Sequence, residues 1–424
     1  MKHGTNAIKV PNNLARGSSI AGIIHNLDEN FKNQLRNDLI NPKPLLICGG
    51  GTSSRCASND HWTVDLRNNF NFINIDLNTS MAEIGGGITM GKLINELSNF
   101  KRSFPIGLSG LTGIGYILTG GISPLSRSEG LAIDRIVEFE GIWGNGEDFR
   151  IIKPKNTASS KEQLTWKALC GAAPFLGIIT KLKIVTEKED PLIIWKGKLN
   201  KKQLIEAIKS SETWSKYSSL QWTWGDSINA YAVFKANRKG STLDIKKLNN
   251  LLSNNINQNL YKVSGLSKMP LFNPMGNNDY YSEVIGLLSH SWGDNSSEII
   301  SKIEKLIESR PNSMCCISSQ QLGELTNCSS KSQTSFIHRK SMWKPWVTAS
   351  WPPDDHESRE QCLSWIKLAW ESLEPYCLGI HLAQMHQHLD WNQKESRAAF
   401  GDWLTGLKEL KKQYDPYGLL PSFL

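Results

Sequence analysis

The segment 381–388 carries the densest group of side chains that could exchange a proton with a substrate. It reads His-Leu-Ala-Gln-Met-His-Gln-His. In an extended strand, side-chain alternation places Gln384, His386 and His388 on one face and His381 on the other. A histidine can act as a general base or hydrogen-bond a substrate hydroxyl near neutral pH. We therefore predict His381, Gln384 and His386 as candidate catalytic residues.

Two alternatives for this segment remain open or are set aside. The same side chains could simply line a contact with a helix. The His-x-His spacing also suggests a metal pair, but no third ligand stands at a usual spacing in the sequence. We predict no metal site.

A glycine turn after an apolar run is the second feature with chemical meaning. Residues 45–54 read Leu-Leu-Ile-Cys-Gly-Gly-Gly-Thr-Ser-Ser. The apolar residues indicate a buried strand, and the glycines let backbone approach a ligand closely. Amides exposed by such a turn form an anion-binding concavity that suits a pyrophosphate. Taken alone, the run favours an ordinary glycine turn.

A second glycine-rich stretch, 104–134, changes that balance. It resembles the central flavin-binding segment of the superfamily of vanillyl-alcohol oxidase and p-cresol methylhydroxylase. Residues 164–180 resemble the motif "LFWALRGGGGNFGVVT" of this superfamily, and residues 411–416 resemble the "KxxYDP" ending of its berberine-bridge type. The resemblance covers about 11–187 and returns at the C-terminus. Four motifs in the same order are far more specific than one.

The resemblance implies an FAD site that is built mostly from backbone. Residues 49–53 would surround the pyrophosphate, 107–121 would pass the isoalloxazine and ribityl chain, and 177–179 would reach the adenine side or flavin edge. Bare backbone suits a planar tricycle and two phosphates. The cofactor-binding candidates are Gly49, Gly50, Gly51, Thr52, Ser53, Ser54, Gly107, Leu108, Ser109, Gly110, Thr112, Gly113, Gly115, Gly120, Gly121, Leu125, Gly177, Ile178, Ile179 and Tyr414.

Departures from the pattern of the superfamily bear on how the flavin is held. Thr52 stands where many relatives carry the histidine that attaches the flavin, and Phe104 stands where plant-type relatives carry a cysteine. We therefore expect non-covalent FAD. The third motif is also altered at Cys170 and at 172–174, which implies weakened flavin affinity or altered chemistry.

The second half of the chain carries weaker resemblances. Residues 336–339 resemble the "FxHR" strand of berberine-bridge-type members, so Arg339 is a fourth catalytic candidate that could face a carboxylate or the reduced flavin, or could make an ordinary exposed ion pair. Residues 381–388 lie where those members carry a "YxN" strand. Arg127 and Asp134 are expected to be structural and to pair with each other.

The function that the resemblance implies is that of an FAD-linked oxidase or dehydrogenase. It would oxidise an alcohol, a sugar or a hydroxy acid by hydride transfer to the flavin, with oxygen, a quinone or a carrier protein as acceptor. One alternative is a degenerate flavin-binding or non-catalytic scaffold. Another is an NADPH-dependent reductase on the same fold, although nothing in the sequence specifies an NADPH site.

The elements that position these residues form an α+β, two-lobed FAD-binding fold with a substrate lobe on an antiparallel sheet. We predict domains at 1–190, 191–395 and 396–424, the last returning to the FAD domain. Predicted elements include a helix at 90–97, a hairpin around the turn at 144–146, a strand at 177–185 and a helix at 397–412. Residues 86–93 nearly match a P-loop, but Leu93 replaces the hydroxyl that would ligate Mg²⁺.

Composition limits the remaining classes. The 424 residues are 39% hydrophobic and 21% charged, as in ordinary globular proteins. The net charge of +8 comes from scattered lysines rather than basic blocks, which disfavours nucleic acid. No leader and no run of about 18 apolar residues is evident, so we expect no membrane span and a cytoplasmic location. The eight cysteines are expected to be free thiols.

Overall fold

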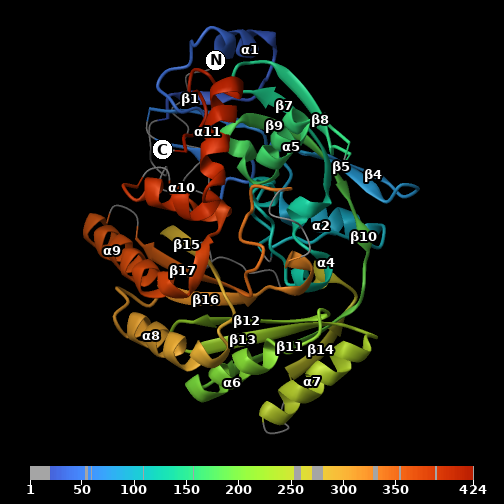
Figure 1. Cartoon of the computed structure of the whole chain (residues 1–424), viewed down its shortest axis with the longest axis vertical. Coiled ribbons are helices and arrows are strands. Elements are labelled where there is room, and N and C mark those ends of the chain that lie inside the picture. Colours follow the sequence, from blue (N-terminus) through green and yellow to red (C-terminus); the bar gives the residue numbers. More distant parts are fainter. Residues whose placement is uncertain are drawn as a thin grey trace.

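The protein has two regions, each with its own β-sheets, and they lie one above the other in the view of Figure 1. The computed structural model describes residues 20–52, 56–58, 60–107, 109–155, 157–252, 259–269, 280–327, 333–352, 355–386 and 389–423. The first region holds a three-stranded and a five-stranded sheet, and the second holds an eight-stranded sheet. The predicted α+β class with a sheet in each lobe is therefore confirmed.

The first region combines parallel and antiparallel pairing. In the three-stranded sheet, β3 (Trp62–Asp65) runs parallel to β1 (Gly22–Ile24) on one side and β2 (Leu46–Cys48) on the other. The five-stranded antiparallel sheet has the order β4 (Ile73–Asp76), β5 (Met81–Gly85), β9 (Gly177–Val185), β7 (Ile136–Trp143) and β8 (Asp148–Ile152). The hairpin at 144–146 and the strand 177–185 are confirmed.

Helix α2 (Met90–Asn99) shows why the first region folds as it does. Thr89 caps the helix by accepting a hydrogen bond from the backbone N–H of Lys92, which satisfies one free amide. Met90, Leu93 and Leu97 repeat at helical spacing and are buried. The other helices of this region are α1 (Glu29–Arg36), α3 (Gly115–Leu118), α4 (Ser126–Glu129) and α5 (Ser160–Ala172). The predicted helix at 90–97 is confirmed.

A short two-stranded pairing leads into the second region. Strand β10 (Glu187–Lys188) pairs antiparallel with β6 (Arg102–Ser103). The eight-stranded antiparallel sheet follows, in the order β14 (Leu260–Val263), β11 (Leu192–Leu199), β13 (Ile228–Lys235), β12 (Ser218–Trp224), β16 (Cys316–Gln321), β17 (Trp343–Trp351), β15 (Tyr281–Ser289) and β18 (Cys377–Ile380).

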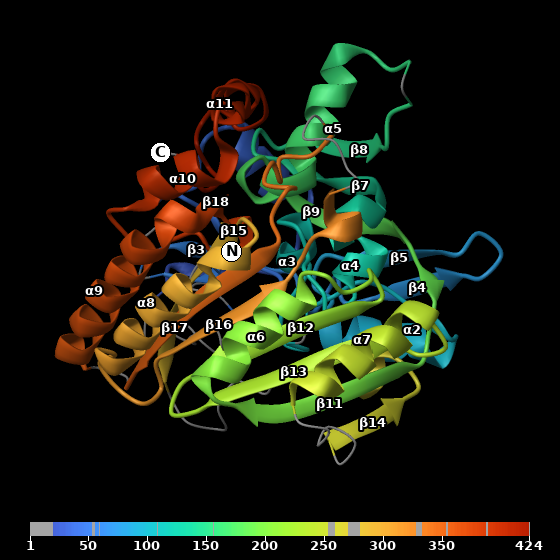
Figure 2. The ribbon, with the colours of Figure 1, turned by 60° about the horizontal axis from the view of Figure 1, so that its bottom comes forward.

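Four helices cover one face of the eight-stranded sheet (Figure 2). They are α6 (Lys201–Ser211), α7 (Lys239–Leu251), α8 (Ser296–Glu308) and α9 (His356–Leu373). Helix α8 is typical, because Ile299, Ile303 and Leu306 form its buried stripe. The opposite face of the sheet is turned toward the first region (Figure 1).

The end of the chain differs from the single helix predicted at 397–412. It forms two helices, α10 (Asn392–Phe400) and α11 (Trp403–Tyr414). Gly401 separates them with φ +52°, a left-handed conformation that glycine adopts without strain. The tail then contacts the first region, where the Leu45 N–H donates to the Leu419 carbonyl at 2.7 Å.

Two predicted strands are wrong. His381 is the residue before a 3-10 helix, Leu382–Gln384, so the alternation assumed for 381–386 does not apply. His388 and Gln387 lie outside the described residues. Residues 336–339 are not a strand but an irregular segment ending in a turn. Elsewhere, local glycine and hydrophobic patterns were sufficient to predict strands and helices. The conformation of these two segments depends on tertiary contacts, which a local pattern does not reveal.

Candidate active site

A pocket opens where the two glycine-rich stretches of the first region meet. Counted together with the open solvent at its mouth, it spans about 980 Å³ of space not filled by atoms. Nine predicted cofactor residues line it: Gly49, Gly50, Gly51, Thr52, Thr112, Gly113, Gly115, Gly177 and Ile179. The predicted strand-to-glycine turn and the second glycine block are therefore brought together, although more than 50 residues separate them in the sequence.

The two stretches touch through bare backbone. A Cβ atom added to Gly50 would lie 2.2 Å from the Gly113 nitrogen, and one added to Gly113 would lie 2.4 Å from the Gly50 nitrogen. Any side chain at either position would force the loops apart. The second loop is held on α2, since the N–H of Met90 donates to the Thr112 carbonyl at 2.8 Å. Glycine is thus required at these two positions by the close approach itself.

Gly115 is the informative exception among the lining glycines. A Cβ atom there would meet no protein atom within 4 Å. Gly115 begins α3, and it borders the pocket. Neither a clash nor a strained backbone angle explains this glycine, so the space in front of it is available to a ligand.

Other lining residues were not predicted from the sequence. They are Ile47, Cys56, Leu66, Gly86, Ile114, Tyr116, Leu118, Pro174, Ala383 and Pro421. Gly86 belongs to the rejected P-loop match at 86–93: its N–H donates to the Thr180 carbonyl at 2.8 Å, at the turn between β5 and α2. The glycine pattern at 86–93 therefore marks a wall of the pocket rather than a loop that binds a nucleoside triphosphate.

The remaining predicted cofactor residues do not line the pocket. Gly107, Ser109, Gly110, Gly120, Gly121, Leu125, Ile178 and Tyr414 stand outside its wall, and Ser53, Ser54 and Leu108 lie outside the described residues. Leu125 and Ile178 are buried core residues. Tyr414 stacks on Trp143 at 4.0 Å between ring centroids, and its hydroxyl lies 2.8 Å from that of Thr165. These residues shape the segments behind the pocket.

Tyr116 and His381 stand at one side of the pocket. Tyr116 lines it, and its hydroxyl donates to the Ile122 carbonyl at 2.8 Å. Burial raises the pKa of Tyr116 well above its usual value, so the phenol stays neutral. The His381 ring makes edge contacts with Tyr116 at 5.9 Å and with Phe336 at 6.0 Å. His381 is fully buried.

Comparison with known proteins agrees with this geometry. Residues 40–151 match the family described as FAD binding domain. The chain is 23% identical to "Uncharacterized FAD-linked oxidoreductase YgaK" of Bacillus subtilis over 89% of its own length and 84% of that protein. It is 32% identical to (R)-6-hydroxynicotine oxidase of Paenarthrobacter nicotinovorans, over 32% of this chain and 29% of that one.

Solved structures share the whole fold. A berberine-bridge-enzyme-like protein of Physcomitrella patens superposes with a TM-score of 0.78 at 19% identity, covering 97% of this chain and 92% of that one. A chitooligosaccharide oxidase superposes with a TM-score of 0.78 at 15% identity, covering 96% and 91%. This chain has an FAD binding domain and the fold of berberine bridge enzyme, and it is an FAD-linked oxidoreductase like its relatives.

His386 of the oxidoreductase lies in a buried ion cluster. Its Nδ1 is 2.6 Å from Glu395 and its Nε2 is 3.2 Å from Glu283. Burial opposes the charged ring, but hydrogen bonds and charges from Glu283 and then Glu395 prevail and raise the pKa of His386 to about 10. A ring that holds its proton throughout the neutral range is a poor proton acceptor. The geometry favours a structural role for His386.

Gln384 of the oxidoreductase lies beside the pocket rather than in its wall. Its neighbour Ala383 lines the pocket, and the Gln384 side chain packs over Gly286 of β15. A Cβ atom on Gly286 would lie 1.7 Å from the Gln384 Oε1. This oxygen is buried and has no hydrogen-bond partner among the described residues.

Arg339 is held away from the pocket. Its two terminal nitrogens each donate to a carboxylate oxygen of Asp134 at 2.8 Å, and a third bond reaches Thr334. The Arg339 side chain is 2% exposed. The predicted pairing of Arg127 with Asp134 is wrong, because Asp134 pairs with Arg339. The proposed structural role of Asp134 nevertheless fits this pair.

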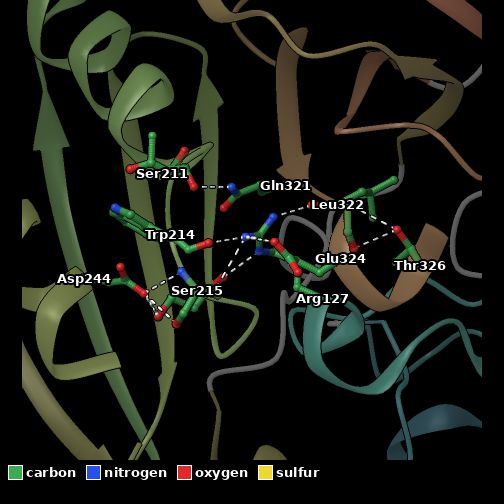
Figure 3. A network of polar contacts seen from close by, with 12 residues as sticks. Arg127, Ser211, Trp214, Ser215, Asp244, Gln321, Leu322, Glu324 and Thr326 are labelled. Carbon is green, nitrogen blue, oxygen red and sulfur yellow. Dashed lines mark hydrogen bonds and ion pairs between the residues drawn. The ribbon is translucent and has the colours of Figure 1, made fainter. Parts of the chain in front are cut away.

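Arg127 connects the two regions of the oxidoreductase instead (Figure 3). From α4 it donates to three backbone carbonyls of the second region: those of Trp214, Ser218 and Leu322, at 2.6 to 2.8 Å. Burial lowers its pKa, and the charge of Glu324 counteracts that shift. Charge-assisted bonds of this kind fix the eight-stranded sheet against the glycine-rich segments.

Metal binding and membrane insertion are two further properties on which the described residues bear. Within those residues, no group of three or more His, Cys, Asp or Glu is placed to hold a metal ion. Among the same residues, no helix is both long and apolar enough to cross a bilayer.

Proposed function

We propose that the oxidoreductase binds FAD without a covalent link and oxidises an alcohol, a sugar or a hydroxy acid. The observation that carries this proposal is the pair of glycine loops at Gly50 and Gly113, which meet through backbone and open beside Tyr116 and His381. Bare backbone is what a dinucleotide pyrophosphate and a flat ring system need. The similar proteins (R)-6-hydroxynicotine oxidase and chitooligosaccharide oxidase differ in substrate, which keeps the proposed substrate class broad.

The non-covalent link is supported by the lining of the pocket. Its described residues include Thr52 but no histidine, and the only thiol among them is that of Cys56. A hydrogen bond with Cys56 is the first cause of a strongly raised pKa at Cys48, so the two thiols interact in a buried pair. Cys48 therefore stays a protonated thiol, and only a thiolate attacks.

Bound FAD would supply the acceptor for two electrons and a hydrogen from the substrate carbon. The protein then has to bind the substrate beside the flavin, exclude water and accept the hydroxyl proton. We propose His381 as the group that accepts this proton, since it is the candidate histidine next to a pocket-lining residue, Tyr116. Tyr116, fixed by its bond to the Ile122 carbonyl, would position the ring.

We also propose a division into domains, a class of electron acceptor and a cellular location. The sheets divide the chain near residue 190, since every strand of the eight-stranded sheet lies between 192 and 380, which supports domains at 1–190, 191–395 and 396–424. The electron acceptor is oxygen, a quinone or a carrier protein. A cytoplasmic location also stays a prediction.

Anaerobic reduction of the FAD-loaded protein tests the proposed reaction. Alcohols, sugars and hydroxy acids are added in turn, and the flavin band near the visible maximum is followed. We expect at least one class to bleach the band, and replacement of His381 by Ala to slow bleaching by about 100-fold or more, the usual contribution of general base catalysis. Bleaching by NADPH alone would point to a reductase. Flavin binding without reduction by any class would favour a scaffold.

A further inference from the structure

A row of polar side chains crosses the eight-stranded sheet on the face turned toward the FAD region. Lys344 of β17 pairs with Gln320 of β16, Gln320 pairs with Gln221 of β12, and Gln221 pairs with Tyr231 of β13. Directly paired residues in a sheet point to the same face. Lys344, Gln320 and Gln221 are each at most 8% exposed. A polar row in the interior of a sheet is unusual and needs an explanation.

The contacts of neighbouring residues settle which face carries the row. Trp343, next to Lys344, points to the helix-covered face, where its indole N–H donates to Glu212 at 2.7 Å. Successive strand residues alternate, so Lys344 points the other way. Tyr231 confirms this side, because its pKa is raised by burial and also by the phenol of Tyr116, which lines the FAD pocket. Trp346, on the same face as Lys344, pairs with Gly286, where an added Cβ would lie 3.2 Å from the His381 Cβ. The row therefore faces the side of the pocket where Tyr116 and His381 stand, and none of its four residues lines the pocket itself.

Lys344 is unlike the other buried lysine of the described residues. Lys235, 7% exposed, is paired with Glu129 at 2.8 Å and Asp190 at 3.3 Å. Lys344, 5% exposed, makes no ion pair or hydrogen bond within the described part of the chain, and its ammonium lies 4.7 Å from the centre of the Trp346 ring. Burial lowers the pKa of Lys344 to about 7. A buried charge without a partner is costly to keep.

The neighbours of Lys344 leave the row rich in donors. The Gln320 Nε2 is buried and has no hydrogen-bond partner among the described residues. The Tyr231 hydroxyl uses its proton on the Gln221 amide oxygen, which leaves the Gln221 amide nitrogen as the free end of that side chain. Ammonium and amide donors without acceptors fit a ligand that brings acceptor oxygens and a negative charge.

We propose that this row is the substrate site of the oxidoreductase and that it binds the carboxylate of an acidic substrate, with Lys344 as the charge partner and Gln320 as a hydrogen-bond donor. This inference rests on the proposed function and narrows it: among alcohols, sugars and hydroxy acids, it selects hydroxy acids, including sugar acids. Trp346 would supply the apolar wall beside the charge, since the ammonium already lies over its ring.

The physical reason is that most of the cost of desolvating the lysine is present before a ligand arrives. A carboxylate that enters meets a lysine already stripped of water and favours its charged form, because opposite charges attract more strongly in a medium of low dielectric. A neutral alcohol of the same size gains no such attraction and leaves Lys344 unpaired. The site should therefore discriminate by charge more than by shape.

Isothermal titration calorimetry with matched pairs of ligands tests the inference. The pairs are glycolate and ethylene glycol, mandelate and 1-phenyl-1,2-ethanediol, and gluconate and sorbitol, each titrated into apoprotein and FAD-loaded protein. We expect at least one carboxylate to bind about tenfold or more tightly than its neutral counterpart, equivalent to about 1.4 kcal/mol. The inference is wrong if no pair shows this preference in the wild type.

Variants then assign the preference to the row. Lys344→Met should abolish the carboxylate preference, and Lys344→Arg should retain part of it, because the charge stays. Lys198→Met is the matched control, since Lys198 is an exposed lysine on β11 of the same sheet, and it should bind as the wild type does. A carboxylate preference that survives in Lys344→Met would overturn the assignment.

Thermal unfolding separates a binding role from a structural one. If Lys344 stabilised the fold, its removal would destabilise the protein, and Lys344→Met would have a lower Tm than the wild type. A lysine kept for its ligand is a cost to the fold, so we expect the Tm of the Lys344→Met apoprotein to rise at pH 7. Calorimetry on the apoprotein can be carried out even if FAD does not bind. Absence of FAD binding would count against the cofactor proposal, whereas absence of a carboxylate preference would count against this inference.

Discussion

The glycine-lined pocket is formed mainly by backbone, whereas the polar face of the eight-stranded sheet is formed by side chains. The pocket wall between Gly50 and Gly113 is backbone, and its shape depends on the absence of side chains. The sheet face opposite depends on particular side chains, with Lys344 and Gln320 directly paired across strands. A backbone-built site suits a constant ligand, and a site of side chains can be retuned one residue at a time. On the proposed assignment, the first site would hold the cofactor and the second would select the substrate.

The pair of Arg339 and Asp134 belongs to the frame between these two sites, and breaking it should have the largest effect. Arg339→Met leaves the half-buried carboxylate of Asp134 without its charge partner and with the Leu131 N–H as its remaining donor among the described residues, and removing one member of a buried ion pair costs up to about 3–5 kcal/mol. Urea unfolding of the apoprotein measures this loss. If Arg339 is instead a catalytic residue, the variant will keep its stability and lose only turnover.

The glycines of the pocket give the sharpest test of a backbone-built site. Gly113→Ala brings a Cβ within 2.4 Å of the Gly50 nitrogen, so we expect overpacking of about 1–3 kcal/mol and a loss of FAD affinity of about tenfold or more. Gly115→Ala meets no protein atom within 4 Å and should keep the apoprotein Tm.

The two glycine variants are compared by flavin fluorescence titration together with Tm. Reduced FAD affinity in Gly115→Ala with an unchanged Tm would show that the cofactor itself occupies the space before this glycine. Wild-type affinity in Gly113→Ala would contradict the idea that the loops must meet through bare backbone.

His386 gives a pH-dependent prediction for the side-chain-built region. Its pKa is raised from 6.5 to about 10 in the folded protein, so its stabilising effect is complete below pH 6.5 and is lost as the pH rises toward 10. A single group changes the free energy of unfolding by at most about 1.4 kcal/mol for each pH unit. Urea unfolding at pH 6, 7, 8 and 9 should show this fall in the wild type.

His386→Gln is the reference for that slope, because other groups also titrate in the same range. The difference in stability between wild type and variant should shrink from pH 7 to pH 9. A constant difference would mean that His386 is neutral in the folded protein, and it would return to the list of candidate bases.

Tyr116→Phe should have the smallest effect of the four. It removes one hydrogen bond, to the Ile122 carbonyl, which is worth about 1 kcal/mol. The rate at which substrate reduces the flavin should change more than stability if Tyr116 positions His381. Equal rates in the variant and the wild type would limit Tyr116 to a wall of the pocket.

The sequence predicted the first site better than the second for a physical reason. Glycines at 49–51, 113 and 177 are visible as a pattern, because close approach of backbone has one chemical solution. Strand 177–185 and the hairpin at 144–146 are also local signals. The partners of Arg339 and His386 are not local: Asp134 is 205 positions away from Arg339, and Glu283 lies on β15. No spacing rule reveals such pairs.

Lys344 is a second example of a residue whose role cannot be predicted from local sequence. A single lysine in a strand of tryptophans reads as an ordinary solvent-facing residue, and only the register with Gln320 and its burial mark it as unusual. Tyr116 and Gly86 could have been found, since each lies within or beside a glycine pattern already noted. Their roles depend on which face of the turn meets the pocket, which the fold decides.

The visible absorption spectrum of the purified protein, taken before and after acid precipitation, tests the central claim most directly. We predict flavin bands in the native protein, or after reconstitution with FAD, that pass into the supernatant. Flavin retained in the pellet would contradict non-covalent binding, and its release in a Cys56→Ala variant would identify the link. A colourless protein that takes up no FAD would contradict the cofactor assignment itself.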